Sequence, residues 1–313
     1  MPYCLDQINQ AVRQDPAAFM AAGDAAFHEK VCRAADLIQS HRDKSPVVLL
    51  SGPSGSGKTT TAGMINAELE RRGIHTHTIS MDDYFLTPDP STAPRTPDGE
   101  MDFESPLMLD LALLDDHFSR LARGEEILVP HFEFARRMRN DSKGTPLRLG
   151  PDEVAIFEGI HALNTTITGK HPEATRLYIS ARSDVVDGEG KVCFKGTWMR
   201  LTRRAVRDYN FRGTGVAETL EMWANVRRGE KLYISPFKGR ADIIFDSSLP
   251  YEVPVMKNYA IPILRSVPQE NERHDEMLQL VDAFQHFEAI DPALVPKDSL
   301  LREFIGGGSY QYH

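Results

Sequence analysis

Apolar positions along the chain follow two different periodicities, and the alternation between them predicts the order of strands and helices. Short aliphatic or β-branched runs bounded by polar and turn residues predict strands at 47–50, 75–80, 154–157, 176–180 and 242–245. Apolar residues at helical spacing predict helices at 25–40, 60–72, 107–122, 199–210 and 274–288. Strands that alternate with helices are typical of α/β proteins. We therefore expect an open, mostly parallel sheet with helices on both faces.

Changes in this alternation divide the chain into a central domain and two flanks. We expect a helical N-terminal extension at 1–45, a core domain at 46–267, and a C-terminal helical extension and tail at 268–313. Inside the core, 86–102 contains four prolines and 181–197 contains three glycines, so both are expected to be long loops. Loops of this length commonly contact substrates or form lids.

Composition and charge narrow the classes of function. The 313 residues carry 36 Lys and Arg against 45 Asp and Glu, and the net charge of −9 disfavours non-specific binding to nucleic acid. No stretch approaches the roughly 18 consecutive apolar residues that a membrane span needs. Cys4, Cys32 and Cys193 are widely spaced and form no metal-binding pattern. We expect a cytoplasmic protein that binds neither nucleic acid nor membrane, and a homo-oligomer is compatible with this composition.

A glycine-rich stretch after the first core strand has the spacing of a phosphate-binding loop. Residues 52–59 satisfy G-x-x-x-x-G-K-(S/T), whose glycines let backbone N–H groups turn toward a phosphate at the start of the next helix. Lys58 would reach the outer phosphates, and the Thr59 hydroxyl would hold Mg²⁺. The expected nucleotide-binding residues are Gly52, Pro53, Ser54, Gly55, Ser56, Gly57, Lys58, Thr59 and Thr60. The fold that they predict is that of a P-loop NTPase.

Acidic residues follow two of the predicted strands. Asp82 and Asp83 come just after the strand at 75–80, and Glu158 comes directly after the strand at 154–157. Ligands of open α/β sheets bind beyond the carboxyl ends of the strands, so these acids are candidates for the active site. Each could bind Mg²⁺ or accept a proton from an attacking hydroxyl. An acid in this position is also a common helix cap or turn residue, and this alternative applies most to Asp83.

An arginine-rich helix is predicted between two glycine-containing stretches. It carries Arg200, Arg203, Arg204, Arg207 and Arg212, and three of these fall on one helical face. Local positive charge of this kind suits the phosphates of a nucleotide and the charge on a transferring phosphoryl group. The alternative is a solvated helix face that pairs with neighbouring acids. The flanking glycines favour a hinged lid near 183–215 that closes over the phosphates and excludes water.

Six motifs in order along roughly residues 46–265 resemble those of the uridine kinase and phosphoribulokinase family of P-loop kinases. They are GPSGSGKTT at 52–60, SMDDYF at 80–85, DFESP at 102–106, VPHFEF at 129–134, FEGI at 157–160, and RRAVRD at 203–208 followed by RG at 212–213. The chain resembles in particular bacterial uridine-kinase-like proteins, which share TLEMW at 219–223, SPF at 235–237 and the closing LREFIGG at 301–307.

This resemblance implies roles for individual residues on the donor side. Asp82 would be the catalytic base toward the acceptor hydroxyl, and Lys58 would stabilise the transferring group. Arg207 and Arg212 would contact the phosphates of ATP from the lid. The residues expected to hold Mg²⁺ are Thr59, Glu158 and Asp82. ATP and Mg²⁺ are therefore the expected cofactors.

The same resemblance implies an acceptor site that departs from the family pattern. Besides Asp82, its expected residues are Tyr84, Asp102, Glu104, Phe132, Arg137 and Arg204. Glu104 stands where the family has an aspartate that holds sugar hydroxyls, with Asp102 as a nearby substitute. In the segment that reads the pyrimidine, the family's Tyr-Asp-Phe and following His are replaced by Phe-Glu-Phe at 132–134 and Ala-Arg-Arg at 135–137. Phe132 can still stack on a ring, whereas the arginines at 136, 137 and 139 would suit an anionic acceptor.

The expected function is transfer of the γ-phosphoryl group of ATP to a small-molecule hydroxyl, first of all the 5′-hydroxyl of uridine or a related nucleoside. Two alternatives stay open. One is a kinase for an anionic acceptor such as a sugar phosphate or a pantothenate-like or glycerate-like acid. The other is a nucleotide-gated regulatory module that signals through the terminal extensions, although Asp82 counts against it because a pure sensor needs no base.

Overall fold

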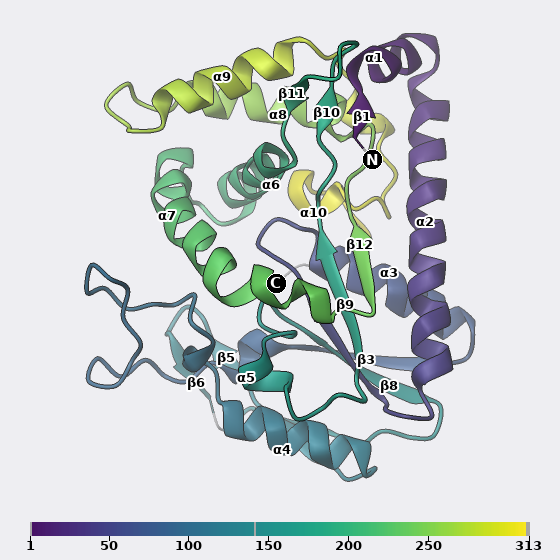
Figure 1. The fold of residues 1–313 in the computed structure, drawn as a ribbon, viewed down its shortest axis with the longest axis vertical. Helices are drawn as coiled ribbons and strands as arrows, with labels where there is room; N and C mark the ends of the chain where they lie inside the picture. Colours follow the sequence, from purple (N-terminus) through teal and green to yellow (C-terminus); the bar gives the residue numbers. More distant parts are fainter. Residues whose placement is uncertain (1, 141, 311–313) are drawn as a thin grey trace.

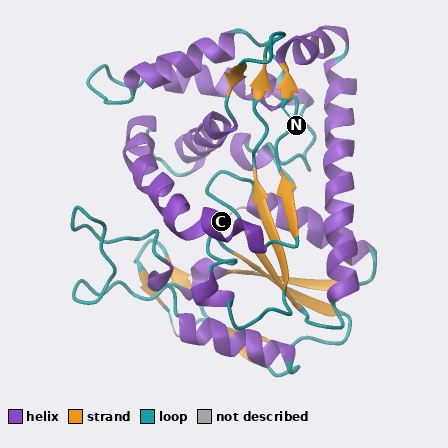
Figure 2. Cartoon of the chain, in the orientation of Figure 1, coloured by secondary structure: helices purple, strands orange, loops and turns teal. Residues whose placement is uncertain are grey.

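Five strands form a fully parallel sheet at the centre of the computed structural model, which describes residues 2–140 and 142–310 (Figures 1 and 2). Across the sheet they run in the order β12 (Ile243–Asp246), β9 (Thr175–Ser180), β2 (Val47–Ser51), β8 (Glu153–Glu158) and β3 (His75–Ser80). The five predicted strands are confirmed, with ends that differ by one residue at most. Because β2 lies in the middle and the chain crosses to both sides of it, a crevice forms at its carboxyl end.

Alternate residues of the strands face two separate apolar cores. Val48 and Leu50 of β2 face a core shared with α2 (Pro16–His41) and α3 (Lys58–Arg71). Val47 and Leu49 face a second core shared with α4 (Leu111–Ala122) and α5 (Thr165–Thr168). Because successive side chains of a strand point to opposite faces, an entirely apolar strand has to be covered on both. The prediction of helices on both faces is confirmed.

Further helices lie above the sheet as drawn in Figure 1 and belong to the larger of these two cores. They are α1 (Leu5–Gln14), α6 (Gly196–Phe211), α7 (Val216–Gly229), α8 (Glu252–Arg265), α9 (His274–Gln285) and α10 (Arg302–Ile305). Both terminal extensions therefore share apolar packing with the sheet. No described helix is long and apolar enough to cross a membrane.

The stretch 181–197, expected to be a loop, contains two strands of a small second sheet. In this sheet β10 (Val185–Val186) pairs with β11 (Val192–Phe194) in antiparallel fashion and with β1 (Tyr3–Cys4) in parallel. The sequence pattern missed these strands because each is only two or three residues long, too short to show a periodicity, and β10 also pairs with the distant strand β1.

Short elements shape the loops beside the sheet. Two hairpins pair β4 (Ile127–Val129) with β7 (Thr145–Leu147) and β5 (Phe132–Glu133) with β6 (Met138–Arg139). Short 3₁₀ helices are η1 (Met81–Tyr84), η2 (Pro106–Met108), η4 (Ser235–Arg240) and η5 (Pro292–Leu294), and η3 (Glu230–Ile234) is a short π-helix. The helix expected at 107–122 begins only at Leu111, because the Asp110 side chain accepts a hydrogen bond from the Leu113 N–H at 3.0 Å and caps it there.

Candidate active site

The predicted P-loop joins β2 to α3 and leaves the first backbone N–H groups of α3 without a cap from their own N-cap residue. Gly55 and Gly57 have φ angles of 73° and 79°, in the left-handed region that favours glycine. Gly57 is the N-cap of α3 and provides no side-chain hydrogen bond to its first turn. Uncapped N–H groups and the positive end of the helix dipole together make a site for an anion.

A cleft of about 830 Å³ opens between the P-loop and the carboxyl ends of β3 and β8. Its lining from the P-loop consists of Ser54, Gly55, Gly57, Lys58 and Thr59. The same cleft is lined by the acids Asp82, Asp83 and Glu158 and by the arginines Arg207 and Arg212. The structure therefore brings together residues from segments that are far apart in the sequence and that were singled out separately. The other predicted nucleotide-binding residues, Gly52, Pro53, Ser56 and Thr60, are not among the residues that line the cleft.

Lys58 and two carboxylates form the charged centre of the cleft. The Nζ atom of Lys58 lies 3.7 Å from a carboxylate oxygen of Glu158, and their side chains are 12% and 15% exposed. Burial raises the pKa of Glu158 to about 7, against the opposing attraction of Lys58. Burial also raises the pKa of Asp82, and Lys58 again acts in the opposite direction. Two neighbouring carboxyl groups are thus held closer to their protonated forms than free acids are.

Asp82 and Asp83 are adjacent but differ in their contacts. The Asp82 N–H donates to the Ser80 hydroxyl oxygen at 3.2 Å, which fixes the turn that carries the Asp82 carboxylate. The Asp83 carboxylate instead accepts from the Phe132 N–H at 3.1 Å and lies 3.4 Å from Nδ1 of His131. Asp83 therefore ties η1 to the β5–β6 hairpin, which is a structural role but differs from the helix cap or turn residue expected as the alternative.

Two arginines at the C-terminal end of α6 line the cleft. Arg207 and Arg212 both lie beside the buried acid Asp208, at 2.9 Å and 3.5 Å. Burial lowers the pKa of Arg212, as does the positive charge of Arg207. Asp208 holds the two guanidinium groups near each other in spite of their mutual repulsion.

Two other arginines of α6 contact the P-loop itself. Arg204 donates to the Ser54 hydroxyl at 3.0 Å, so a predicted acceptor residue touches the loop. Arg200 donates to the Ser54 carbonyl at 3.2 Å and forms a paired contact with Glu230 at 2.7 and 2.8 Å. The arginines of the predicted helix therefore have different roles. Arg207 and Arg212 line the cleft, whereas Arg200 and Arg204 contact the P-loop.

The two acids expected to bind sugar hydroxyls, Asp102 and Glu104, have different contacts. Asp102 is buried and accepts hydrogen bonds from Arg228 at 2.5 Å and from the Tyr233 hydroxyl at 3.0 Å. Glu104 lies beneath α7, so close that a Cβ at Gly229 would be 2.4 Å from the Glu104 Cβ. Burial raises the pKa of Glu104. Asp102 is thus engaged by an ion pair, whereas Glu104 is packed against the end of α7 and is not among the residues that line the cleft.

The other predicted acceptor residues lie in three different environments. Tyr84 is in the core, where its hydroxyl is 2.8 Å from Nδ1 of His117. Phe132 is buried, with its ring centre 5.6 Å from that of Phe85. Arg137 is exposed in the turn of the β5–β6 hairpin, with a φ angle of 50°. The structure does not place these three side chains around one ligand-sized space.

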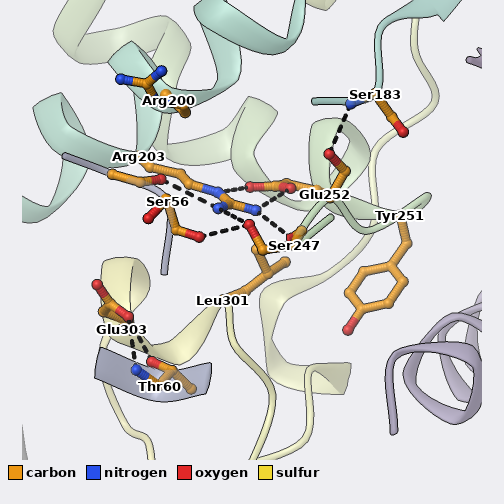
Figure 3. Close-up of polar contacts among 12 residues, drawn as sticks. Ser56, Thr60, Ser183, Arg200, Arg203, Ser247, Tyr251, Glu252, Leu301 and Glu303 are labelled. Atoms are coloured by element: carbon orange, nitrogen blue, oxygen red, sulfur yellow. Dashed lines mark hydrogen bonds and ion pairs between the residues drawn. The ribbon is translucent and has the colours of Figure 1, made fainter. Parts of the chain in front are cut away.

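A buried ion pair supports the P-loop from behind, and sequence reasoning missed it. Arg203 lies 2.7 Å from a carboxylate oxygen of Glu252 and donates to the Gly55 carbonyl at 3.2 Å and the Ser247 carbonyl at 2.9 Å (Figure 3). The Ser247 hydroxyl donates in turn to the Ser56 carbonyl at 2.6 Å. Arg203 was noticed only as part of the arginine helix, because nothing in the spacing connects it to Glu252.

The C-terminal segment contributes a second missed residue. Glu303 of α10 lines the cleft and accepts a hydrogen bond from the Thr60 hydroxyl at 2.6 Å (Figure 3). It belongs to the closing motif at 301–307, which was recognised in the sequence without any assigned role. Only the fold shows that this motif lies next to the P-loop.

The parallel sheet with a P-loop after its central strand defines a P-loop protein, and its cleft has the charged groups of a phosphotransferase. The sequence model of the phosphoribulokinase/uridine kinase family matches residues 47–253, and the chain belongs to this family. It is therefore a phosphotransferase that acts on an alcohol acceptor, as the motifs implied.

Individual relatives agree with this assignment. The uridine kinase of Geobacillus sp. (strain WCH70) is 29% identical over 203 residues, which cover 64% of this chain and 86% of that protein. The uridine kinase of Schizosaccharomyces pombe is 26% identical over 267 residues, which cover 82% of this chain and 53% of that protein.

The solved structures that match this chain include a protein described as a possible uridine kinase from Bacillus stearothermophilus and a D-glycerate 3-kinase from Cryptococcus neoformans var. grubii. The first has a TM-score of 0.41 and 18% identity and covers 64% of this chain and 88% of its own. The second has a TM-score of 0.34 and 16% identity and covers 88% of this chain and 87% of its own.

Proposed function

We propose that this chain transfers the γ-phosphoryl group of ATP to a hydroxyl of a neutral small molecule, with the 5′-hydroxyl of uridine or a related nucleoside as the first candidate. The observation that carries the proposal is the presence in one cleft of Lys58, Arg207 and Arg212 together with Asp82 and Glu158. Phosphoryl transfer depends on cations that neutralise the phosphates and on a carboxylate that receives the proton of the acceptor. The uridine kinases among the relatives support the nucleoside.

The residues of the cleft fit a triphosphate and a magnesium ion. The start of α3, which has no side-chain cap from its N-cap residue Gly57, suits phosphate oxygens, and Lys58 is its first residue. Thr59, Asp82 and Glu158 offer hydroxyl and carboxylate oxygens, which are the ligands that Mg²⁺ prefers. When bound, the ion would offset the negative charge of the phosphates. We infer that Lys58 and the two arginines hold the phosphate oxygens and keep the γ-phosphoryl group in line with the acceptor.

Asp82 is the proposed base on the acceptor side. As the acceptor oxygen forms its bond to the γ-phosphorus, the bond to the β–γ bridging oxygen breaks and the hydroxyl proton passes to the Asp82 carboxylate. Its raised pKa suits this role, because a more basic carboxylate accepts a proton more readily. Glu104 is the proposed ligand of the sugar hydroxyls, since Asp102 is already bonded to Arg228 and a tyrosine.

The charge distribution favours a neutral acceptor over an anionic one. Of the three arginines that would have suited an anion, Arg136 lies 3.1 Å from Glu133, Arg139 lies 2.7 Å from Asp110, and Arg137 is exposed in the turn of the β5–β6 hairpin. The acceptor end of the cleft presents the carboxylate of Asp82, which would repel a second negative charge. An uncharged polyol such as a nucleoside avoids this repulsion.

An acceptor panel scored by ADP release tests the proposal. Purified protein with ATP and MgCl₂ would be assayed with uridine, cytidine, adenosine, a sugar phosphate, glycerate and pantothenate at equal concentrations. We expect release of ADP that depends on a nucleoside, and a loss of about 10²-fold or more in the Asp82→Asn variant with ATP binding retained. Asp116→Asn, an exposed acid of α4, is the matched control.

Two results would count against the proposal. A strong preference for an anionic acceptor would replace the nucleoside with the anionic alternative. Tight ATP binding with slow hydrolysis that no acceptor accelerates would favour the regulatory module instead.

A further inference from the structure

The C-terminal segment places a carboxylate on hydrogen-bond donors at the start of the P-loop helix. One carboxylate oxygen of Glu303 accepts from the Thr60 hydroxyl at 2.6 Å and from the Thr60 N–H at 3.3 Å (Figure 3). This N–H belongs to the first turn of α3, to which the N-cap residue Gly57 gives no side-chain bond. An internal carboxylate thus occupies part of the helix end that attracts anions.

The backbone that carries Glu303 is firmly packed beside the loop. Leu301 and Phe304 of this segment are fully buried, and the Arg203 guanidinium lies 5.2 Å from the centre of the Phe304 ring. Leu300 lies against Gly57 so closely that a Cβ there would be 2.6 Å from a Leu300 methyl carbon. The packing of these apolar side chains therefore fixes α10 beside the P-loop. The Glu303 side chain also lines the cleft, with 7% of the residue exposed.

The geometry points to competition, and we propose that Glu303 is an internal anion that competes with the nucleotide's phosphates for Thr60 and so weakens nucleotide binding. This inference rests on the proposed function, because it needs a nucleoside triphosphate in the cleft. Backbone N–H groups of a P-loop cradle the α- and β-phosphates, and Thr60 directly follows the motif. A phosphate that binds to Thr60 has to displace the Glu303 carboxylate or share Thr60 with it. If both bind to Thr60, their negative charges lie close together and repel each other. The C-terminal segment, which lies outside the matched family region, thereby sets the affinity of the P-loop for its nucleotide.

Two substitutions separate the charge of Glu303 from its hydrogen bond. Glu303→Gln keeps the size of the side chain and an oxygen that can accept from Thr60, but removes the negative charge. Glu303→Ala removes both. The matched control is Glu288→Gln, which makes the same change in net charge at an acid of the C-terminal extension that is 45% exposed and lies 2.8 Å from Arg13. If the alanine variant does not fold, the glutamine variant decides the question alone.

The measurement is isothermal titration of each full-length variant with ATP in the presence of MgCl₂ and without any acceptor. We expect both Glu303 variants to bind ATP at least about fivefold more tightly than the wild type, and the control to stay within about twofold. Equal or weaker binding by the Glu303 variants would overturn the inference and leave the kinase function standing. Absence of ATP binding in the wild type and in every folded variant would overturn both.

Discussion

Loss of one partner from the buried pair of Arg203 and Glu252 should destabilise the protein strongly. In Glu252→Gln the shape of the side chain is kept, but the Arg203 guanidinium is left in the core without an opposite charge. The two side chains are 0% and 2% exposed, so water cannot replace the lost carboxylate. Removal of one partner from a buried ion pair costs about 3–5 kcal/mol, which is a large fraction of the roughly 5–15 kcal/mol that keeps a domain folded.

Urea-induced unfolding followed by circular dichroism gives the free energy of unfolding for this test. The matched control is Glu276→Gln in α9, which breaks an ion pair to Arg273 in which the glutamate side chain is 36% exposed and should cost less than about 1 kcal/mol. The double variant Arg203→Met, Glu252→Leu should recover part of the loss, because an apolar pair leaves no buried charge. If Glu252→Gln unfolds within about 1 kcal/mol of the wild type, the reasoning from burial is refuted.

Three further predictions concern the cleft and its surroundings. Lys58→Ala should lower turnover by about 10³-fold or more while the fold is retained, because it removes a charge that stabilises the transferring group; turnover near the wild-type rate in a steady-state assay would exclude the assigned site. Burial raises the pKa of Glu158 from 4.5 to about 7, so the folded state binds this proton more tightly than the unfolded state and loses stability as the pH rises from about 4.5 to 7. As the pH rises from 4.5 to 8, the free energy of unfolding of Glu158→Gln should therefore increase by about 3 kcal/mol relative to that of the wild type, measured in urea without magnesium or nucleotide. A difference between the two proteins that stays constant across this range would contradict the assigned pKa. Tyr84→Phe should cost about 1–3 kcal/mol of stability, because it leaves a buried His117 nitrogen without its partner at 2.8 Å, and it should leave the KM for the acceptor unchanged; an increase of about tenfold in that KM would instead place Tyr84 at the substrate.

The strands and the P-loop could be predicted because their signals are local. A run such as Val47-Val48-Leu49-Leu50 is short and apolar at every position, as a strand covered on both faces requires. The P-loop needs glycines at fixed positions because Gly55 and Gly57 take left-handed φ angles that other residues rarely adopt. Signals of this kind depend on a few neighbouring residues and are visible without the fold.

The acceptor residues were harder to predict because their roles depend on competing partners. Asp102 and Glu104 have similar chemistry and lie two positions apart, yet Asp102 is bonded to Arg228 whereas Glu104 lies under α7. Tyr84 belongs to a recognised motif, but its hydroxyl points to His117 in the core. A motif names the residue types of a site and leaves open which of them face the ligand.

By itself, the sequence determined where the strands of the main sheet lie along the chain, the phosphate-binding loop and the acids at the carboxyl ends of β3 and β8, since each depends on residues adjacent in the chain. Only the tertiary structure decided that Arg203 and Glu252 support the loop and that Glu303 contacts Thr60. These pairs join segments that are far apart in sequence, and no local pattern of charge or hydrophobicity determines which distant partner a buried polar group will meet. The packing of the whole chain makes that choice.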